Sequence, residues 1–139
     1  MGAKYLLPLT LACLAPLAVA RVIDITDEAE YEKTVLGSKQ SAIVEFAATW
    51  CGVCNRVKPS FEEVSDEPAF KNVAFVRVDI DNAPELRRKN GIVGVPSFLY
   101  VQGGQNKHER VGVQSVKTFK DDFRKELCDV FELDTTEEA

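Results

Sequence analysis

Cys51 and Cys54 are the residues of this sequence whose types and spacing point most directly to chemistry. They stand three positions apart in TWCGVC, residues 49–54. A C-x-x-C pair can exchange electrons with other thiols and disulfides, supply two of the four ligands of a zinc ion, or form a structural disulfide. Each of these possibilities makes a different demand on the rest of the chain.

The rest of the sequence favours redox chemistry over the two other possibilities. A structural zinc site needs four ligands, and after residue 20 the only further thiol and imidazole belong to Cys128 and His108, with no second closely spaced pair. A disulfide across a three-residue link would remove little entropy from the unfolded chain. At 139 residues, the chain is also large enough to bury a core without disulfides.

The cysteine pair stands at the start of a predicted helix. Apolar residues recur at helical spacing from the second cysteine onward, at Cys54, Val57, Phe61 and Val64. Unpaired N–H groups at a helix N-terminus stabilise a thiolate, which is the attacking species. We therefore predict that Cys51 is the nucleophile and that Cys54, further into the helix, is the resolving thiol. Trp50 would shield the pair and offer a substrate protein an apolar surface, and Gly52 would let the backbone turn tightly.

The pattern along the chain predicts alternating strands and helices. Apolar runs predict strands at residues 22–25, 42–48, 73–80, 97–101 and 107–113. Caps, glycine stops and helical periodicity predict helices at residues 26–37, from 54 onward, at 82–91 and at 115–131. This order predicts one α/β domain over residues 21–133, with a central mixed sheet flanked by helices on both faces. Glu45 is conspicuous because it is charged and lies in the otherwise apolar strand at 42–48.

Composition and charge exclude some classes of function. Hydrophobic residues make up 45% of the chain and charged residues 28%, as in ordinary globular domains. The net charge of −5, with Lys and Arg scattered along the sequence, gives no basic surface for nucleic acid. His108 is expected on the surface of a hairpin, outside the catalytic machinery.

Residues 1–20 are predicted to be a cleavable signal peptide. Lys4 precedes an uncharged run from Tyr5 to Ala20, which ends in an A-x-A pattern just before Arg21. The run is about 16 residues long, shorter than the roughly 20 that span a bilayer. We expect a secreted protein or one of the secretory lumen, with no stable membrane insertion after cleavage; a cytoplasmic or membrane-anchored protein is the alternative. Residues 134–139 are predicted to be an acidic flexible tail.

Several separated stretches resemble the thioredoxin family, in the family's order. They are VEFAATWCGVC at 44–54, VDID at 78–81 and GIVGVPSF at 91–98, within a match over about residues 22–131. The resemblance implies a thioredoxin fold and an oxidoreductase that acts on disulfides of protein substrates, most simply as a reductase. It implies no cofactor beyond the Cys51–Cys54 disulfide, a monomeric state, and a thioredoxin reductase or another dithiol donor as partner.

The resemblance also implies roles for residues outside the cysteine pair. Val95 and Pro96 resemble the family's cis peptide, which faces the cysteines and whose backbone binds an extended substrate strand. Glu45 corresponds to the family's buried acid and is a candidate to accept the proton of Cys54. The alternative for Glu45 is an ion pair with Arg77, which stays protonated and would hold the carboxylate charged.

Val53 departs from the family pattern. Thioredoxins usually have proline at this position and disulfide isomerases have histidine, whereas valine brings no positive charge beside the Cys51 thiolate. This absence favours a reductant over a strong oxidant. Two other functions stay open at this point: an oxidase or isomerase similar to the domains of protein disulfide isomerase, and a non-enzymatic module that binds substrates or acts as a chaperone.

Overall fold

The structure of the protein is a computed structural model, which describes residues 21–134. The predicted signal peptide, residues 1–20, lies outside this range, and so do residues 135–139 of the predicted tail. Within the described range, no helix is long and apolar enough to cross a membrane.

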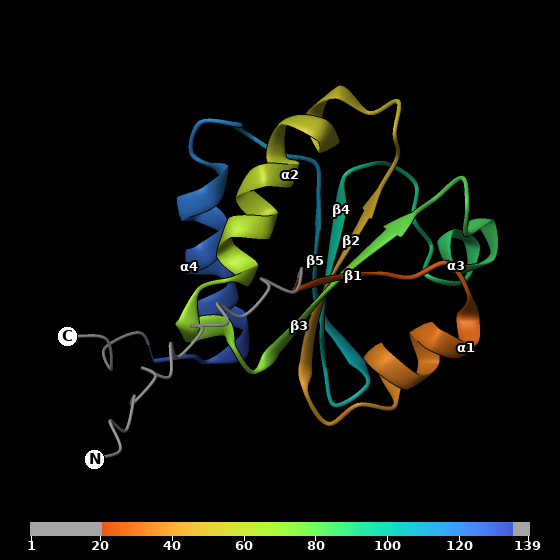
Figure 1. The fold of residues 1–139 in the computed structure, drawn as a ribbon, viewed down its shortest axis with the longest axis horizontal. Coiled ribbons are helices and arrows are strands. Elements are labelled where there is room, and N and C mark those ends of the chain that lie inside the picture. Colours follow the sequence, from red (N-terminus) through yellow and green to blue (C-terminus); the bar gives the residue numbers. More distant parts are fainter. Residues whose placement is uncertain (1–20, 135–139) are drawn as a thin grey trace, which may run out of the picture.

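A five-stranded sheet forms the centre of the molecule (Figure 1). Its strands, in spatial order, are β1 (Val22–Asp24), β3 (Val73–Asp79), β2 (Ser41–Ala47), β4 (Ser97–Gln102) and β5 (Gln105–Val111). The first three run parallel, whereas β4 is antiparallel to β2 and β5 is antiparallel to β4. The mixed sheet predicted from the sequence is confirmed. Because β2 and β3 are parallel neighbours, their carboxyl ends lie side by side.

Helices cover both faces of this sheet. Helix α2 (Gly52–Ser65) and α4 (Phe119–Phe131) lie on one side, and α1 (Glu28–Tyr31) and α3 (Pro84–Lys89) lie on the other (Figure 1). A π-helical segment, η1 (Glu32–Leu36), continues α1, and the short 3-10 helix η2 (Pro68–Phe70) precedes β3. The predicted layers are therefore present, and α2 begins directly at the cysteine pair.

The largest differences from the sequence-based prediction lie in two helical segments, since α2 and α3 begin within two residues of the predicted starts. Helix α4 begins at Phe119, four residues later than expected, because Phe119 is the first buried side chain of the segment while Val116 is 36% exposed and packs no additional turn. The predicted helix at 26–37 changes to π geometry in its second half. There the N–H of Gly37 donates to the carbonyl oxygen of Glu32, five residues back, at 2.6 Å, and the helix ends at this glycine as predicted.

The sheet separates two apolar clusters. The α1–α3 cluster contains Ala42, Val44 and Phe46 of β2, together with buried residues of α1, η1 and α3. The α2–α4 cluster contains Ile43 of β2, the buried apolar side chains of α2 after its first turn, and those of α4. Since side chains alternate along a strand, Glu45 lies on the same face as Ile43, under α2. Glu45 is only 1% exposed, so its carboxyl group lies in an otherwise apolar layer.

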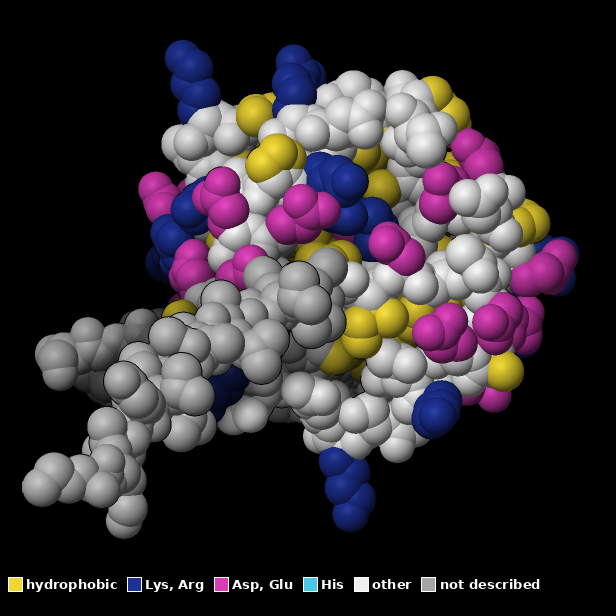
Figure 2. Space-filling model, viewed as in Figure 1, with side chains coloured by type: hydrophobic (Ala, Val, Ile, Leu, Met, Phe, Trp, Pro, Cys, Tyr) yellow, Lys and Arg dark blue, Asp and Glu magenta, His cyan; other side chains and the backbone are white. Residues whose placement is uncertain are grey.

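Acidic and basic side chains are interspersed on the molecular face that Figure 2 shows. On that face, neither sign forms one continuous area. This distribution agrees with the scattered charges of the sequence, and it offers no extended basic surface there for a phosphate backbone.

Candidate active site

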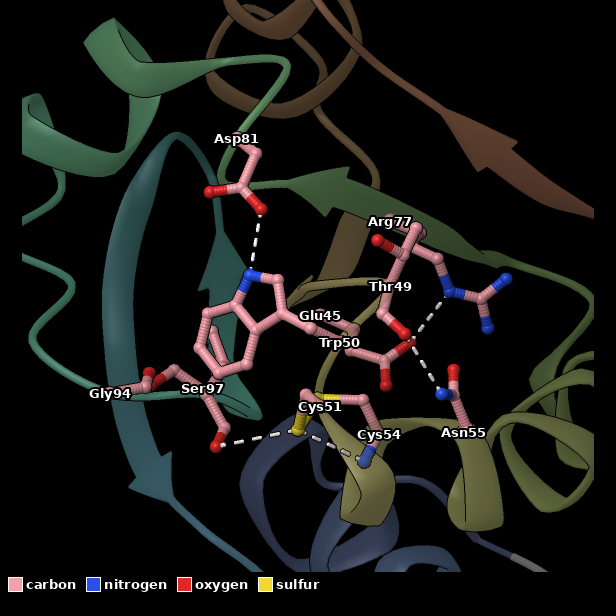
Figure 3. Close-up of a disulfide and its surroundings, with 11 residues drawn as sticks. Glu45, Thr49, Trp50, Cys51, Cys54, Asn55, Arg77, Asp81, Gly94 and Ser97 are labelled. Atoms are coloured by element: carbon pink, nitrogen blue, oxygen red, sulfur yellow. Dashed lines mark hydrogen bonds and ion pairs between the residues drawn. A yellow bond between two sulfur atoms is a disulfide. The ribbon is translucent and has the colours of Figure 1, made fainter.

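The cysteine pair lies where β2 passes into α2. Cys51 is the N-cap of α2, with an extended backbone at φ −82° and ψ 106°, and Cys54 lies in the first turn. The two residues form a disulfide with their Cα atoms 5.2 Å apart (Figure 3). The backbone N–H of Cys54 donates to Sγ of Cys51 at 3.2 Å. In the reduced protein this N–H, together with the positive end of α2, stabilises a thiolate on Cys51.

The two sulfurs have different neighbours. Sγ of Cys51 lies 3.8 Å from the carbonyl oxygen of Val95, on the side of the loop before β4. Cys54 instead lines a cavity of about 170 Å³ that also contains Glu45 and Arg77. As residues, Cys51 is 7% exposed and Cys54 is 3% exposed, so the predicted difference in exposure has the expected sign but is small.

The loop beside Cys51 is held in place by the hairpin of β4 and β5. The peptide bond between Val95 and Pro96 is cis, as the family resemblance implied. The N–H of Gly112 donates to the carbonyl oxygen of Pro96 at 2.8 Å, and the hydroxyl of Ser97 donates to the carbonyl oxygen of Gly94 at 2.6 Å. Pro96 is buried and Val95 is half-buried. This segment therefore presents a fixed backbone next to the reactive sulfur.

Trp50 is the most exposed aromatic side chain beside the pair, at 68%. Its indole Nε1–H donates to the carboxylate of Asp81 at 2.8 Å (Figure 3). The sequence-based reading assigned Trp50 to substrate contact but did not identify Asp81 as its partner. The sequence did contain an indication of this contact. Asp81 closely follows β3, whose carboxyl end lies beside that of β2.

Gly52 and Val53 behave differently from each other. Gly52 is the first residue of α2, has no positive φ, and a Cβ built on it would meet no atom within 4 Å. The predicted need for glycine in a tight turn is therefore wrong, because neither the backbone nor the surrounding space requires glycine here. Val53 is half-buried and packs against both apolar clusters, which fixes the first turn of α2.

The predicted contact between Glu45 and Arg77 is present. The two residues are directly paired on β2 and β3, and Arg77 Nε donates to Glu45 Oε2 at 2.9 Å. Glu45 Oε1 is buried and has no hydrogen-bond partner. Burial raises the pKa of Glu45, and the charge of Arg77 opposes this effect without cancelling it. Glu45 is thus a carboxyl group with a raised pKa and one unpartnered oxygen, and it lines a cavity together with Cys54.

Two residues of α2 complete the surroundings of this acid. Arg77 Nη1 donates to Glu62 Oε1 at 3.3 Å, and Lys58 Nζ lies 3.6 Å from the same oxygen. Neither residue was singled out from the sequence, although Cys54, Lys58 and Glu62 are spaced four apart and must share one face of the helix. Their spacing was the signal that could have placed them beside Glu45.

Residues 21–134 contain no group of three or more His, Cys, Asp or Glu side chains that could hold a metal ion. His108 lies on β5, away from the cysteine pair, with Nε2 2.8 Å from Glu126. Cys128 is a free, half-buried thiol on α4.

Comparison with known proteins agrees with this geometry. The family model described as Thioredoxin matches residues 22–125. The chain belongs to the thioredoxin family. It is 36% identical over 85 residues to a thioredoxin of Malassezia sympodialis, an alignment that covers 61% of this chain and 81% of that protein. The crystal structure of Malassezia sympodialis thioredoxin (Mala s 13) matches with a TM-score of 0.71 and 28% identity, over 81% of this chain and 92% of the other.

A further relative joins the thioredoxin unit to a second activity. The "Bifunctional thioredoxin reductase/thioredoxin" of Mycobacterium leprae is 36% identical over 92 residues, which cover 66% of this chain and 20% of that protein. Within the thioredoxin family the reactive group is the disulfide itself, and no further cofactor is needed. With its Cys51–Cys54 pair at disulfide distance, the protein is a thiol–disulfide oxidoreductase.

Proposed function

We propose that this thioredoxin-family protein reduces disulfides in protein substrates, with Cys51 as the nucleophile and Cys54 as the resolving thiol. The observation that carries these roles is the asymmetry of the pair. Cys51 Sγ accepts an N–H bond at the start of α2 and adjoins the Val95 carbonyl, whereas Cys54 adjoins the cavity that contains Glu45. A substrate approaching over the 91–96 loop would therefore meet Cys51 first.

In the proposed cycle, the Cys51 thiolate attacks one sulfur of the substrate disulfide. A bond forms between Cys51 and that sulfur, and the other substrate sulfur leaves as a thiolate. Cys54 then loses its proton and attacks Cys51, which releases the second substrate thiolate and leaves the Cys51–Cys54 disulfide. The two released thiolates take up protons from solvent, and the proton of Cys54 returns to solvent, so the net transfer from the protein to the substrate is two electrons.

Glu45 is the proposed acceptor of the Cys54 proton. A general base works best when its pKa lies near the operating pH. Burial raises the pKa of Glu45 above the usual range of a glutamate and therefore towards that pH. Glu45, whose Oε1 has no hydrogen-bond partner, and Cys54 both line one cavity, which supports proton transfer between them. The cavity then offers the proton a route to solvent.

The backbone near Val95 and Pro96 is the proposed contact for the substrate chain. An extended segment beside Cys51 can exchange backbone hydrogen bonds with this loop, as a strand added to an edge does. Trp50 and Val93, which are 68% and 84% exposed, offer apolar side chains for contact with the substrate.

Trapping with Cys54→Ser tests the division of roles. Without the resolving thiol, mixed disulfides at Cys51 should accumulate and be recoverable with their substrates by non-reducing electrophoresis. Cys51→Ser should trap none, and Cys128→Ser, placed in all variants, removes the third thiol of residues 21–134 as a source of cross-links. Equal trapping by both single variants would contradict the assignment.

The direction of electron flow is a separate part of the proposal. Val53 places no cation beside the Cys51 thiolate, which supports reduction over strong oxidation. Equilibration of the Cys51–Cys54 couple with glutathione measures this directly, since a strongly reducing couple excludes the oxidase or isomerase function. A thioredoxin reductase is the proposed electron donor, which the fused reductase of the Mycobacterium leprae relative supports.

Entry into the secretory pathway is also proposed, on the basis of residues 1–20. The uncharged run ending in Ala18-Val19-Ala20 supports cleavage after Ala20. Sequencing the N-terminus of protein purified from the medium of a secreting host tests this proposal. A terminus at Arg21 is the expected result, and one at Met1 would refute cleavage.

A further inference from the structure

We propose that Glu62 is a positioning residue of the active site, which holds the Arg77 guanidinium away from the free oxygen of Glu45. This inference rests on the proposed role of Glu45 as proton acceptor and adds the group that keeps its Oε1 available. Glu62 lies on α2, two helical turns after Cys54, and does not itself contact the reacting sulfurs.

The first step of the argument is the way in which Arg77 binds Glu45. A guanidinium and a carboxylate readily form two parallel hydrogen bonds. Here the contact is single: Nε donates to Glu45 Oε2 at 2.9 Å, while Glu45 Oε1 and Arg77 Nη2 are both buried without a partner. Two adjacent buried groups of opposite charge thus leave one bond unmade, so another contact must hold the guanidinium in its present orientation.

Glu62 provides that contact. Its Oε1 accepts from Arg77 Nη1 at 3.3 Å, on the opposite end of the guanidinium from Glu45. The ring of Phe61 lies against the same group, with 5.5 Å between the guanidinium carbon and the ring centroid. The guanidinium is therefore shared between a buried acid on β2 and a half-exposed acid on α2. Without Glu62, it is free to turn towards Glu45 and form the second bond.

Such a turn would change what Glu45 can do. With both oxygens held by Arg77, the carboxylate would be more stable and a weaker base, and neither oxygen would face Cys54 unpartnered. The negative charge of Glu62 acts in the same sense through space, since it raises the pKa of Glu45. Loss of Glu62 therefore lowers the pKa of Glu45 by two routes.

Other charged groups face this cavity from the neighbouring elements. Asp24 of β1 and Asp79 of β3 line it together with Arg77 and Lys58. Lys58 is 54% exposed along its side chain and contacts Glu62 at 3.6 Å, so solvent screens its charge. Asp24 is paired with Arg77 in the sheet register, but no hydrogen bond joins their side chains. Among the acids that line or adjoin this cavity, Glu45 and Glu62 are the two bonded to the guanidinium.

The neighbouring residue Glu63 offers a matched control. It is 59% exposed along its side chain, compared with 47% for Glu62, and it pairs with Lys120 of α4 instead of Arg77. Substitutions at these two adjacent positions remove the same charge from the same turn of α2. Only the change at Glu62 should reach Glu45.

The experiment compares Glu62→Gln and Glu62→Leu with Glu63→Gln and Glu63→Leu in the full chain. In the oxidised protein, carbon-13 NMR of the side-chain carboxyl groups follows the titration of Glu45 with the two cysteines silent. We expect Glu62→Leu to increase the acid dissociation constant of Glu45 by about two- to fivefold, as befits a partly screened charge. Glu62→Gln keeps an oxygen for Arg77 and should have a smaller effect, and the Glu63 variants none.

A kinetic measurement links this change to the reaction. Stopped-flow mixing of the reduced protein with an aromatic disulfide reagent releases one coloured thiolate on attack by Cys51 and a second on resolution by Cys54. In Glu62→Leu, the acid limb of the resolution rate should move to lower pH, with its midpoint at a proton concentration about two- to fivefold higher than in the wild type. The rate of the first phase should stay as in the wild type.

The outcomes separate the two proposals. If the pKa of Glu45 is the same in the Glu62 variants as in the Glu63 variants, the proposed role of Glu62 is overturned. If Glu45→Gln leaves the acid limb of resolution in place, the proposed role of Glu45 fails, and the kinetic effect of Glu62 fails with it. In that case the NMR titration still decides whether Glu62 controls the proton affinity of Glu45.

Discussion

Replacement of Arg77 with methionine tests how the buried charge of Glu45 is tolerated. Methionine keeps most of the aliphatic packing of arginine but removes the cation that contacts Glu45 Oε2. Burial already raises the pKa of Glu45 against the influence of Arg77, so loss of the cation should raise it further. A raised pKa in the folded state gives stability that is present at low pH and lost as the pH rises through that pKa.

The size of the effect follows from the burial of the two partners. An exposed ion pair contributes about 0–1 kcal/mol, whereas removing one member of a buried pair costs about 3–5 kcal/mol. Glu45 is 1% exposed along its side chain and Arg77 is 13% exposed, and a single hydrogen bond joins them. We therefore expect Arg77→Met to lower the free energy of unfolding by about 2–4 kcal/mol at a pH near 8. Near pH 4.5, where folded Glu45 is mostly protonated, the loss should be about 1 kcal/mol.

Urea unfolding of the oxidised protein, followed by circular dichroism at both pH values, measures this difference. The double variant Arg77→Met with Glu45→Gln completes a cycle, because it removes the charge that the first change leaves unpaired. It should recover most of the loss at the higher pH. A destabilisation by Arg77→Met that is equal at both pH values, or that is additive with Glu45→Gln, would refute the reasoning.

Three further predictions concern packing, backbone and the tryptophan. Phe123→Ala should lower the free energy of unfolding by about 3–5 kcal/mol in urea titrations, because the ring is fully buried and stacks on neighbouring rings of the α2–α4 cluster; a cost below 1 kcal/mol would contradict this. Gly104→Ala should lower the free energy of unfolding by more than about 2 kcal/mol, because φ is +74° and a Cβ would lie 2.4 Å from a carbonyl oxygen of η1. Gly103 has φ +59° but open space around a Cβ, so Gly103→Ala should lower the free energy of unfolding by only about 1 kcal/mol. Asp81→Ala should lower the fluorescence anisotropy of Trp50, the single tryptophan, with a stability loss of at most about 1 kcal/mol, and an unchanged anisotropy would show that the bond does not restrain the indole.

The reactive pair and the sheet were predictable because their signals are local. The spacing of Cys51 and Cys54 and the helical pattern after them place the pair at a helix N-terminus without any knowledge of the fold. Apolar runs identified all five strands, with bounds that differ from the structure by at most two residues. Glu45 stood out for the same reason, as a charge in an apolar run.

Segment ends were less predictable, since they depend on contacts that distant residues provide. The start of α4 is set by the burial of Phe119 under the sheet, and hydroxyl-bearing residues before it gave an equally good local start. The role expected of Gly52 failed for a related reason. In the sequence alone, a glycine between two cysteines indicates a turn, whereas in the structure a regular helix begins at this residue.

The partners of the site residues were the least predictable part. Asp81 reaches Trp50 across 31 positions, and Glu62 reaches Arg77 across 15. The first contact depends on two parallel strands ending at one edge, and the second on the rotation of α2 over the sheet. The pairing of Glu45 with Arg77 could be anticipated only because the family resemblance placed both residues.

Helix α2 belongs to two layers of the molecule at once. Its first turn, with Cys51 and Cys54, packs in the α1–α3 cluster, whereas Val57, Phe61 and Val64 pack in the α2–α4 cluster. Stability therefore depends largely on the α2–α4 cluster, whereas reactivity depends largely on the first turn of α2 and the groups around it. The aromatic layer against α4 can be redesigned to raise stability while the reactivity of the cysteines is retained, provided that Phe61, whose ring lies against Arg77, is kept.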